Sequence, residues 1–393
     1  MNIKPPYHLT SLLPKMDLKN KTVLLRADLN VPLHNGTILN DFRLKALLPT
    51  IDLICKKEGN VLLVTHIGRP TDKEETLSTH HLIEWFQEHH YDITYAASIE
   101  EAASLLKTSS FVLLENIRFW SEEKTGDKNF SQKLKNISEC YVMDAFGVTH
   151  RNDTSVTTLP SLYQSGNRTI GLLVEKELKE LNKLIETPRQ PFLMFLGGAK
   201  VKTKLPLLAN MLDKIAGCAL LPPLSFTFQK AEGISTGTSL VDETLIPEAK
   251  VILQKAQTLN KKISFPSDYL VAQNWSDKSH AITYDSFSDH DMGITIGPKT
   301  ITAFSKAAHY AHTIFINGLP GDMRYPNTLI AAHDLCLEIC NSSFAYKVAA
   351  GGDTVSLIQK FKLDGCFDFI STGGGATLTY LSGEELPGLL LFL

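Results

Sequence analysis

The stretch PFLMFLGGAKVKTKLPLL, residues 191–208, decides the fold class of this chain. An apolar run ends in Gly197 and Gly198, and a polar segment with lysines at 200, 202 and 204 follows. This order predicts a buried strand, a tight glycine turn and the start of a helix. Amides at a helix start favour anions, and Lys200 and Lys204 share one helical face. The pattern is not GxxxxGK[ST], so it predicts a phosphate site of another kind than the P-loop.

Similar apolar runs, rich in Val, Ile and Leu, recur on both sides of this stretch. They cover residues 21–29, 60–67, 110–117 and 139–146 in the first half, and 217–222, 262–272, 312–317, 347–352 and 367–375 in the second. Helical patterns such as residues 43–57 separate them. Continuous apolar strands that alternate with helices indicate parallel sheets covered on both faces. The sequence therefore predicts an α/β protein with two Rossmann-like domains in tandem.

An amphipathic segment at 171–191, GLLVEKELKELNKLIETPRQP, separates the two series of strands. Its leucines follow a 3.6-residue period, and Pro188 and Pro191 end the pattern. We expect a connecting helix at 171–188 between a first domain at 1–170 and a second domain at 189–375.

The composition is that of an ordinary soluble globular protein. Hydrophobic residues make up 43% of the 393 residues, and the net charge of −3 gives no sign of a nucleic-acid or anionic-membrane partner. The six cysteines form no CxxC pair, which favours reduced core thiols over a zinc site. The N-terminus lacks an apolar signal region, and no run approaches the roughly 18 apolar residues of a membrane span. We expect a cytoplasmic protein.

Cationic and polar side chains follow the strands of the first half. In parallel α/β sheets, ligands bind at the carboxyl ends of the strands. An arginine after any one strand is more often part of a surface salt bridge, but several strand ends together indicate an anion site, because guanidinium groups grip phosphate and carboxylate oxygens. The ligand predicted is small and carries phosphate or carboxylate and hydroxyl groups. The candidate residues are Asp28, Asn30, Arg43, His66, Arg69, Arg118 and Arg151.

Glycine-containing turns follow three strands of the second half. AGGDT at 350–354 and STGGGAT at 371–377 repeat the arrangement seen at Gly197 and Gly198. One such turn can be a plain tight turn, but three of them with paired lysines indicate a polyphosphate site. Asp353 is suited to hold Mg²⁺ on that phosphate.

Nine motifs, in this order, resemble phosphoglycerate kinase over essentially the whole chain: LLRADLNVP, THIGRP, LLENIRF, DAFGVTHR, LGGAKVKTK, GPKTI, GGDT, STGGGAT and ELPG. The resemblance implies two α/β domains around a hinge-bending cleft, with residues 376–393 returning to the first domain. It implies reversible phosphoryl transfer between 1,3-bisphosphoglycerate and ADP, giving 3-phosphoglycerate and ATP, with Mg²⁺. The seven candidates of the first half then form the phosphoglycerate site. The implied nucleotide site comprises Gly197, Gly198, Lys200, Lys204, Asn317, Arg324, Gly351, Gly352, Asp353 and Thr354.

The implied chemistry fits these residue types. The acceptor is a carboxylate with no proton to remove, so the reaction needs no general base, and positioning and charge stabilisation should carry catalysis. Arg43 from one domain, Lys200 from the other, and the amides of Gly373 and Gly374 are the groups expected at the transferring phosphoryl group. This arrangement requires the two domains to close, which also excludes water.

The chain departs from the family pattern around the nucleoside. A glycine-rich GGGMA-type stretch reads LPPLS here, with Pro222 and Pro223, and Leu319 replaces a proline. Ala350 replaces the first glycine of GGGDT, and Arg324 stands where the family has a ribose-binding glutamate. Arginine cannot accept a hydrogen bond from ribose, although it can pair with phosphate. We therefore expect an active kinase with altered nucleoside recognition.

Two other classes of function compete with this interpretation. A former kinase can retain its phosphoglycerate site as a binding or regulatory protein without turnover. A dinucleotide-dependent dehydrogenase fits poorly, because no GxGxxG opens either half. Nothing in the sequence demands more than a monomer.

Overall fold

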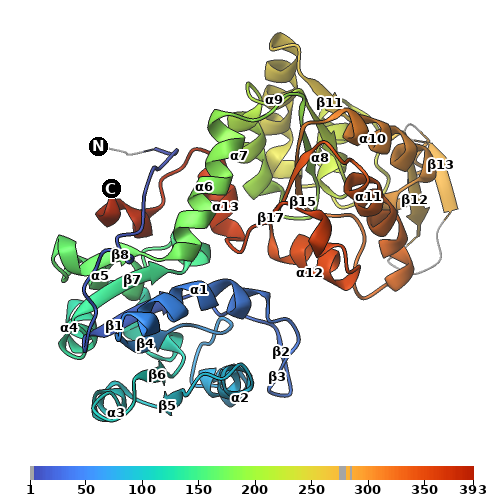
Figure 1. Ribbon diagram of the computed structural model, residues 1–393. Helices are drawn as coiled ribbons and strands as arrows, with labels where there is room; N and C mark the ends of the chain where they lie inside the picture. The colour runs from blue at the N-terminus through green and yellow to red at the C-terminus, as the bar shows by residue number, and fades with distance from the viewer. Residues whose placement is uncertain (1–3, 274–279, 284–285) are drawn as a thin grey trace. The chain divides into compact units, whose positions relative to one another are not determined.

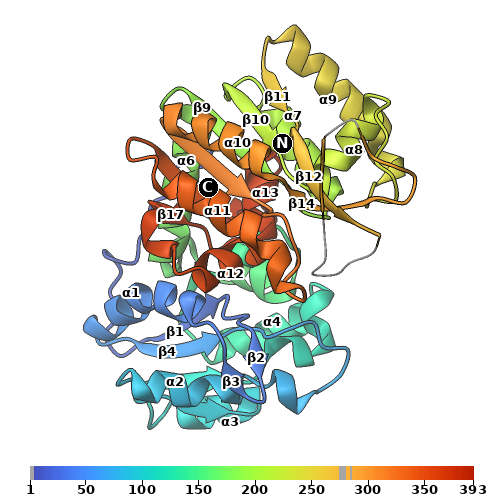
Figure 2. The same ribbon diagram turned by 90° about the vertical axis from the view of Figure 1, so that its right-hand side faces the viewer.

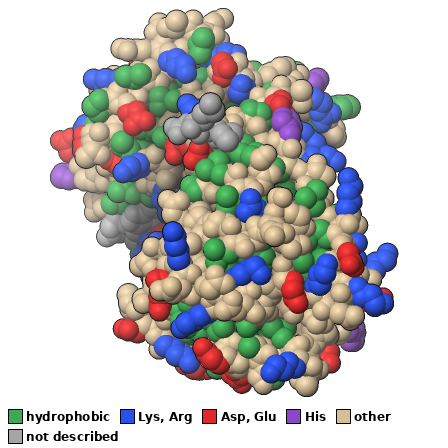
Figure 3. All heavy atoms as spheres, turned by 90° about the vertical axis from the view of Figure 1, so that its left-hand side faces the viewer, with side chains coloured by type: hydrophobic (Ala, Val, Ile, Leu, Met, Phe, Trp, Pro, Cys, Tyr) green, Lys and Arg blue, Asp and Glu red, His purple; other side chains and the backbone are tan. Residues whose placement is uncertain are grey.

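The computed structural model describes residues 4–273, 280–283 and 286–393. The chain divides into two compact units: unit 1 comprises Met1–Lys179 with Glu385–Leu393, and unit 2 comprises Glu180–Glu384 (Figure 1). Among the described residues, no helix is long and apolar enough to cross a membrane. Cationic and anionic side chains are interspersed on the face drawn in Figure 3, in keeping with 39 basic and 42 acidic residues.

Unit 1 is built on a six-stranded parallel sheet with the order β5-β6-β4-β1-β7-β8. Its strands are β1 (Thr22–Ala27), β4 (Asn60–Val64), β5 (Thr94–Ala96), β6 (Phe111–Leu114), β7 (Cys140–Asp144) and β8 (Arg168–Ile170). Its helices are α1 (Phe42–Lys56), α2 (Ile83–Glu88), α3 (Ile99–Leu105), α4 (Lys128–Asn136) and α5 (Leu159–Ser161). The small hairpin of β2 (Leu33–His34) and β3 (Thr37–Ile38) lies outside the sheet.

Both faces of this sheet are covered, as the continuous apolar runs predict. Val23 and Leu25 of β1 belong to a core cluster with Leu47 and Ile51 of α1. Leu24, which points to the opposite face, is also fully buried. A strand buried on both faces cannot alternate polar with apolar residues, which explains the pattern in the sequence.

Unit 2 has a second parallel sheet, with the order β11-β10-β9-β15-β16-β17. Its strands are β9 (Phe192–Leu196), β10 (Gly217–Leu220), β11 (Lys262–Ser264), β15 (Thr313–Asn317), β16 (Tyr346–Ala349) and β17 (Phe369–Ile370). The helices are α7 (Val201–Met211), α8 (Leu224–Ala231), α9 (Ile246–Thr258), α10 (Pro298–Tyr310), α11 (Ile330–Cys340), α12 (Gly352–Lys360) and α13 (Gly375–Leu381). This is the doubly wound order 3-2-1-4-5-6, so the fold class is confirmed and the strand order reverses between β9 and β15.

One strand prediction is wrong. Residues 262–272 do not form a single strand. Pro266 lacks an N–H to donate to a neighbouring strand, and the run is divided there into β11 and β12 (Asp268–Ala272). β12 instead joins β13 (His280–Thr283) and β14 (Met292–Ile296) in an antiparallel sheet that the sequence patterns did not indicate. This sheet lies beside α8, where Phe226 packs against Tyr269 (Figure 2).

The helix α6 (Leu172–Glu186) contains the boundary between the two units. Its N-terminus is held in unit 1, because the amide of Val174 donates to Asp144 Oδ1 at 3.0 Å. The final residues form the short helix η11 (Pro387–Phe392) in unit 1, and the amide of Gly388 donates to the carbonyl of Thr149 at 2.8 Å. The last segment therefore packs directly behind the loop that follows β7.

Candidate functional site

The candidate anion site of unit 1 lies where four neighbouring strands end. β6, β4, β1 and β7 are adjacent in the sheet, and their carboxyl ends bring the loops after residues 27, 64, 114 and 144 to one edge. Six of the seven residues predicted from the sequence lie in the segments that follow these strands, within seven residues of a strand end, and Arg43 is the second residue of α1. This juxtaposition follows from the parallel topology alone.

Asp28 and Arg43 form the central ion pair of this edge. Arg43 Nη1 contacts Asp28 Oδ2, and the Asp28 side chain is only 8% exposed. Burial alone would raise the pKa of Asp28, but Arg43 and other cationic groups hold it at about 2. Gly147, after β7, leaves room for the carboxylate: a Cβ there would lie 2.1 Å from Asp28 Oδ2. Asp28 is therefore ionised and fixed in orientation at neutral pH.

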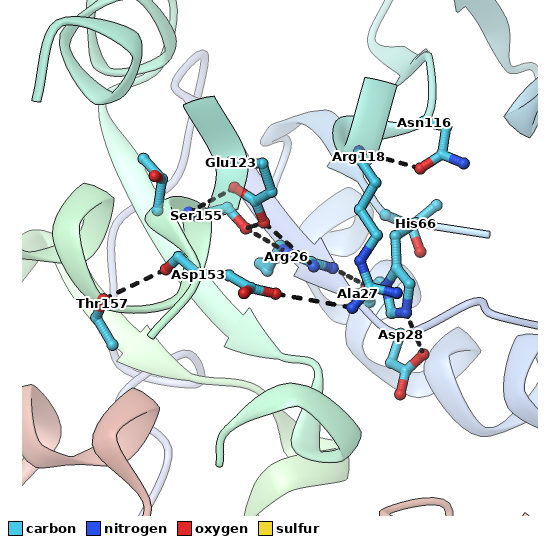
Figure 4. Close-up of polar contacts among 12 residues, drawn as sticks. Arg26, Ala27, Asp28, His66, Asn116, Arg118, Glu123, Asp153, Ser155 and Thr157 are labelled. Carbon is cyan, nitrogen blue, oxygen red and sulfur yellow. Dashed lines mark hydrogen bonds and ion pairs between the residues drawn. The ribbon is translucent and has the colours of Figure 1, made fainter. Parts of the chain in front are cut away.

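His66 lies on the other side of the same carboxylate. Its Nε2 is 3.9 Å from Asp28 Oδ1, and the residue is 2% exposed (Figure 4). Burial lowers the pKa of His66 well below its usual value, although Asp28 acts in the opposite direction. The ring is therefore neutral at pH 7 and can donate one N–H to a ligand.

The backbone of Gly68 connects Asn30 with Arg118. Its amide donates to Asn30 Oδ1 at 2.8 Å, and its carbonyl accepts from Arg118 Nη1 at 2.7 Å. Gly68 has φ +64°, a conformation that side chains rarely adopt. The next residue, Arg69, is exposed on the same loop.

Arg118 and Arg151 bring two positive charges together at the ends of β6 and β7. Burial and the proximity of Arg151 lower the pKa of Arg118 to about 10. Arg151 Nε is buried and has no hydrogen-bond partner within the described part of the chain. Asp153 offsets part of the charge, with its Oδ2 3.7 Å from Arg118 Nη2. An anion bound here would relieve the repulsion and supply the missing acceptor.

A buried network that the sequence analysis missed lies beside this site. Arg26 of β1 and Glu123 are both fully buried, with Arg26 Nη2 3.8 Å from Glu123 Oε1, and Ser155 lies between them (Figure 4). An arginine inside an otherwise apolar strand is the signal that would have indicated a buried carboxylate partner. His150, beside Arg151, was also missed, and burial lowers its pKa.

The candidate nucleotide site of unit 2 is a pocket of about 750 Å³. It lies at the strand ends around the point where the sheet order reverses, which is the expected location for a ligand in this fold. Nine of the ten residues predicted to bind nucleotide line it: Gly198, Lys200, Lys204, Asn317, Arg324, Gly351, Gly352, Asp353 and Thr354. Gly374 also lines it, whereas Gly197 and Gly373 do not.

Gly197 has a packing role at the reversal point. A Cβ on Gly197 would lie 2.3 Å from the carbonyl oxygen of Gly318, and a Cβ on Gly318 would lie 2.0 Å from the carbonyl oxygen of Gly197. The backbones of the loops after β9 and β15 are therefore in direct contact. This proximity brings Lys200 and Asn317 to one pocket.

The two lysines differ in their surroundings. Lys200 is exposed at the N-cap of α7, whereas Lys204, one turn later, is 6% exposed. Burial and the charge of Lys200 lower the pKa of Lys204 to about 8, and Asp353 partly counters the shift. A buried ammonium aimed at a pocket favours an anionic ligand, because the ligand would restore the interactions that burial removed.

The loop before α12 is held by Asn317 and Thr354. Asn317 Nδ2 donates to the carbonyl of Ala350 at 2.7 Å, and the amide of Gly318 donates to Thr354 Oγ1 at 2.8 Å. Asn317 Oδ1 is buried and has no hydrogen-bond partner among the described residues. Gly351 has φ +96°, and a Cβ there would lie 2.4 Å from Asn317 Nδ2. Gly351 is therefore required for the loop to approach both Asn317 and the pocket.

The two glycines in the turn before α13 have different surroundings. Gly374 has φ +52° and lines the pocket. The amide of Gly373 donates to Ser371 Oγ at 3.1 Å. Of the two amides expected at the transferring phosphoryl group, that of Gly373 therefore already has a partner in this structure.

Arg324 lines the pocket together with an acidic residue that the sequence analysis missed. Its Nε lies 3.0 Å from Asp322 Oδ1, and its side chain is 76% exposed. Much of the pocket wall is apolar, formed by Pro222, Pro223, Leu240, Met292, Ile294, Leu319 and Met323. The pocket thus combines lysines and glycines with apolar surface suited to a flat apolar group.

Within the described residues, no group of three or more His, Cys, Asp or Glu side chains is placed to hold a metal ion. Asp353 is exposed and lines the nucleotide pocket. Mg²⁺ is commonly held by one or two carboxylates and substrate phosphates, so a single carboxylate fits a nucleotide-borne ion.

Comparison with known proteins identifies relatives across nearly the whole length of the chain. The family model described as phosphoglycerate kinase matches residues 13–384. The phosphoglycerate kinase of Nitratiruptor sp. is 37% identical over 391 residues, covering 95% of this chain and 96% of that protein. That of Prosthecochloris aestuarii is 36% identical, covering 96% and 98%. The solved phosphoglycerate kinase of Pyrococcus horikoshii superposes with a TM-score of 0.84 at 28% identity, over 96% of this chain and 97% of that one. The resemblance inferred from the motifs is thereby confirmed.

Proposed function

The chain belongs to the phosphoglycerate kinase family, and from this premise we propose how its two sites carry out the family's reaction. The protein is a phosphotransferase of glycolysis that moves a phosphoryl group between 1,3-bisphosphoglycerate and ADP, giving 3-phosphoglycerate and ATP. The comparisons give no support to the alternative of a binding protein without turnover. The observation that carries the residue assignment is Lys204, a buried ammonium facing a glycine-lined pocket.

Phosphoglycerate binds in this proposal at the strand ends of unit 1. Arg118 and Arg151 grip its phosphate or carboxylate, because both guanidinium groups lie at one edge and repel each other without an anion. Asp28, ionised and fixed by Arg43, accepts from the substrate hydroxyl, and neutral His66 donates one N–H. Arg69 and Asn30 complete the site from the adjacent loops.

ADP or ATP binds in the pocket of unit 2. Lys204, Lys200 and the turns at Gly198 and Gly351 surround the phosphates, and Thr354 and Asn317 hold those turns in place. The base lies against the apolar wall that includes Pro222 and Pro223. Since Arg324 cannot accept from ribose, we assign the acceptor role to Asp322, the carboxylate that Arg324 contacts. Nucleoside recognition is therefore altered relative to the family pattern.

The transfer needs no proton acceptor, because a carboxylate at neutral pH has no proton to lose. Arg43 and Lys200 place positive charge at the reacting oxygens, and the amide of Gly374 adds a donor. When bound with the nucleotide at Asp353, Mg²⁺ would neutralise phosphate charge. Donor and acceptor must meet in line and away from water, so the proposal includes closure of the two units on each other.

The remaining expectations concern the state and location of the protein. We propose that it acts as a monomer in the cytoplasm, on small-molecule substrates alone. The near balance of charge and the described helices are compatible with this proposal.

A coupled assay tests the proposed function. Purified protein is mixed with ATP, Mg²⁺ and 3-phosphoglycerate, and glyceraldehyde-3-phosphate dehydrogenase reports the product through NADH consumption. Sustained turnover that depends on both substrates supports the kinase. Saturable binding of 3-phosphoglycerate without NADH consumption would support the binding protein instead.

A further inference from the structure

Glu123 lies at the centre of the network beside the anion site of unit 1. It is 0% exposed and belongs to η4 (Ser121–Lys124), the short helix that follows the Arg118 turn. Its Oε1 accepts from Ser155 Oγ at 2.5 Å, and its Oε2 accepts from the amide of Ser155 at 2.9 Å. Arg26 Nε donates to the same Ser155 Oγ at 2.7 Å (Figure 4). One carboxylate thus joins the elements after β6 and β7 to strand β1.

The segment around Glu123 touches two of the three loops that carry the substrate arginines. Lys124 Nζ donates to the carbonyl of Pro70, next to Arg69, at 3.3 Å. Thr154 Oγ1 donates to the carbonyl of Glu122 at 2.5 Å and accepts from the amide of Asp127 at 2.9 Å. Because Arg118 precedes this segment, the relative positions of all three arginine-bearing loops depend on it.

The carboxyl group of Glu123 faces the buried guanidinium of Arg26 and can neutralise it. Burial raises the pKa of Glu123 to about 7, whereas Arg26 and the hydrogen bonds from Ser155 act in the opposite direction. An unpaired guanidinium inside a protein is strongly unfavourable, and removal of its partner disturbs the surrounding structure more than removal of both charges does. Arg26 Nη1 also contacts the carbonyl of Ala27, the residue before Asp28. A change in the Arg26–Glu123 pair would therefore reach both the Asp28 end and the Arg151 end of the site.

We propose that Glu123 is a positioning residue for phosphoglycerate. It does not line the strand-end site, but it fixes the loop at 151–155 against the Arg118 turn and so sets the spacing of Arg118 and Arg151. The identity of the ligand rests on the proposed function, whereas the geometry of the network does not.

The test compares Glu123→Gln with Glu122→Gln. Glutamine keeps the size of the side chain and removes the carboxyl group that can ionise. Glu122 is the matched control because it is the adjacent residue and has the same side chain. Its carboxylate accepts from Ser121 Oγ instead of joining the network. Calorimetric titration with 3-phosphoglycerate, steady-state kinetics and thermal denaturation are measured for both variants and for the wild-type protein.

For Glu123→Gln we expect the Kd and KM for 3-phosphoglycerate to rise about tenfold, since small displacements of binding groups are costly, and the KM for ATP to change by less than about twofold. Glu122→Gln should match the wild-type protein in all three. A lower Tm with unchanged 3-phosphoglycerate affinity would overturn the proposal, because that result describes a purely structural residue.

Ser155→Ala guards against failure of Glu123→Gln to fold. It retains the side chains of Arg26 and Glu123 and removes the hydroxyl that connects them, so it should also raise the Kd for 3-phosphoglycerate. Unchanged affinity in this variant would also overturn the proposal. The proposed function fails separately if the wild-type protein does not bind 3-phosphoglycerate.

Discussion

The guanidinium of Arg324 is paired with the carboxylate of Asp322, its Nε lying 3.0 Å from Oδ1 and 3.1 Å from Oδ2. The pair places opposite charges side by side in the nucleotide pocket. Because Arg324 is largely exposed, the contact contributes little to stability, and its importance lies in what it presents to a ligand. Arginine at position 324 offers hydrogen-bond donors only. The carboxylate that it contacts, that of Asp322, is the acceptor available to a ligand there.

We predict weak discrimination between ADP and GDP, with Kd values that differ by less than about tenfold. Strong discrimination requires polar groups that would be left unpaired by the wrong base, and the wall of this pocket is mainly apolar. Parallel calorimetric titrations with ADP and GDP measure the ratio. Tight ADP binding with a preference of about a hundredfold or more over GDP would contradict altered nucleoside recognition.

The variant Asp322→Asn tests recognition of the ribose independently of recognition of the base. If Asp322 accepts from ribose hydroxyls, the variant should lose about tenfold or more in affinity for ADP and for GDP alike, since hydrogen bonds to charged acceptors contribute about 1.5–3 kcal/mol. Equal affinities for the wild-type protein and the variant would remove Asp322 from the site.

Gly351 and Gly352 are adjacent and provide a matched pair of substitutions. Gly351→Ala forces a side chain into the φ +96° conformation and within 2.4 Å of Asn317 Nδ2, whereas a Cβ on Gly352 meets nothing within 4 Å. We expect Gly351→Ala to weaken ADP binding by about tenfold or more and Gly352→Ala to have little effect on the fold, since strain of this kind costs about 1–3 kcal/mol. Thermal denaturation distinguishes the two, because Gly352 also lines the pocket and only the stability comparison isolates the contact with Asn317. Equal Tm values for the two variants would contradict the close approach of Asn317.

The parts of the molecule that depend on strand order were predictable from the sequence. Once apolar runs alternate with helices, parallel pairing follows, and residues such as His66 and Arg118 must lie at one edge even though 52 positions separate them. The glycine turns were predictable for the same reason. These inferences use only the position of a residue after a strand.

Features that depend on side-chain pairing across the chain were not predictable. Glu123 and Ser155 meet through hydrogen bonds between loops, and no spacing rule connects them. Asp322 was not predictable because its place in the pocket wall beside Arg324 depends on how the turn at 321–325 folds, which no sequence pattern specifies. The antiparallel sheet around β12 was missed because its apolar run continues from β11 across Pro266.

Lys204→Met should weaken nucleotide binding and stabilise the protein without ligand. Burial lowers the pKa of Lys204 to about 8 from 10.5, so the charged form carries a folding cost that methionine removes. We expect the free energy of unfolding to rise by about 1–3 kcal/mol at pH 7 and the Kd for ADP to rise about tenfold or more. Denaturant unfolding and calorimetry give the two quantities. Lys202→Met, at an exposed position two residues earlier, is the control and should change neither.

Arg43→Ala should lower kcat by about a hundredfold or more while changing the Kd for ADP by less than about twofold, because Arg43 belongs to unit 1 and, in the proposed mechanism, supplies charge to the transition state. Removing it also takes away the partner of Asp28, so the pKa of that carboxyl should rise. Lys45→Ala, which removes an exposed cation paired with Asp41, serves as the control. A variant that loses ADP binding but keeps kcat would contradict the assignment.

The pH dependence of stability should report Asp144, the buried carboxyl that accepts from the Val174 amide at the start of α6. Burial raises its pKa to about 7 from 3.8, so between these values the folded state holds a proton that the unfolded state has lost. Stability from this group is therefore lost as pH rises through that window, which amounts to about 2–3 kcal/mol between pH 5 and pH 8. Asn at this position keeps an acceptor for Val174 and does not titrate.

The free energy of unfolding of Asp144→Asn, minus that of the wild-type protein, should consequently become more positive as pH rises from 5 to 8. Denaturant unfolding of both proteins at several pH values gives this difference. Every other titrating group, including His66, is present in both proteins and cancels in the subtraction. A difference that stays constant from pH 5 to pH 8 would show that Asp144 is ionised in the folded state throughout, because only a proton held to about pH 7 makes the difference rise.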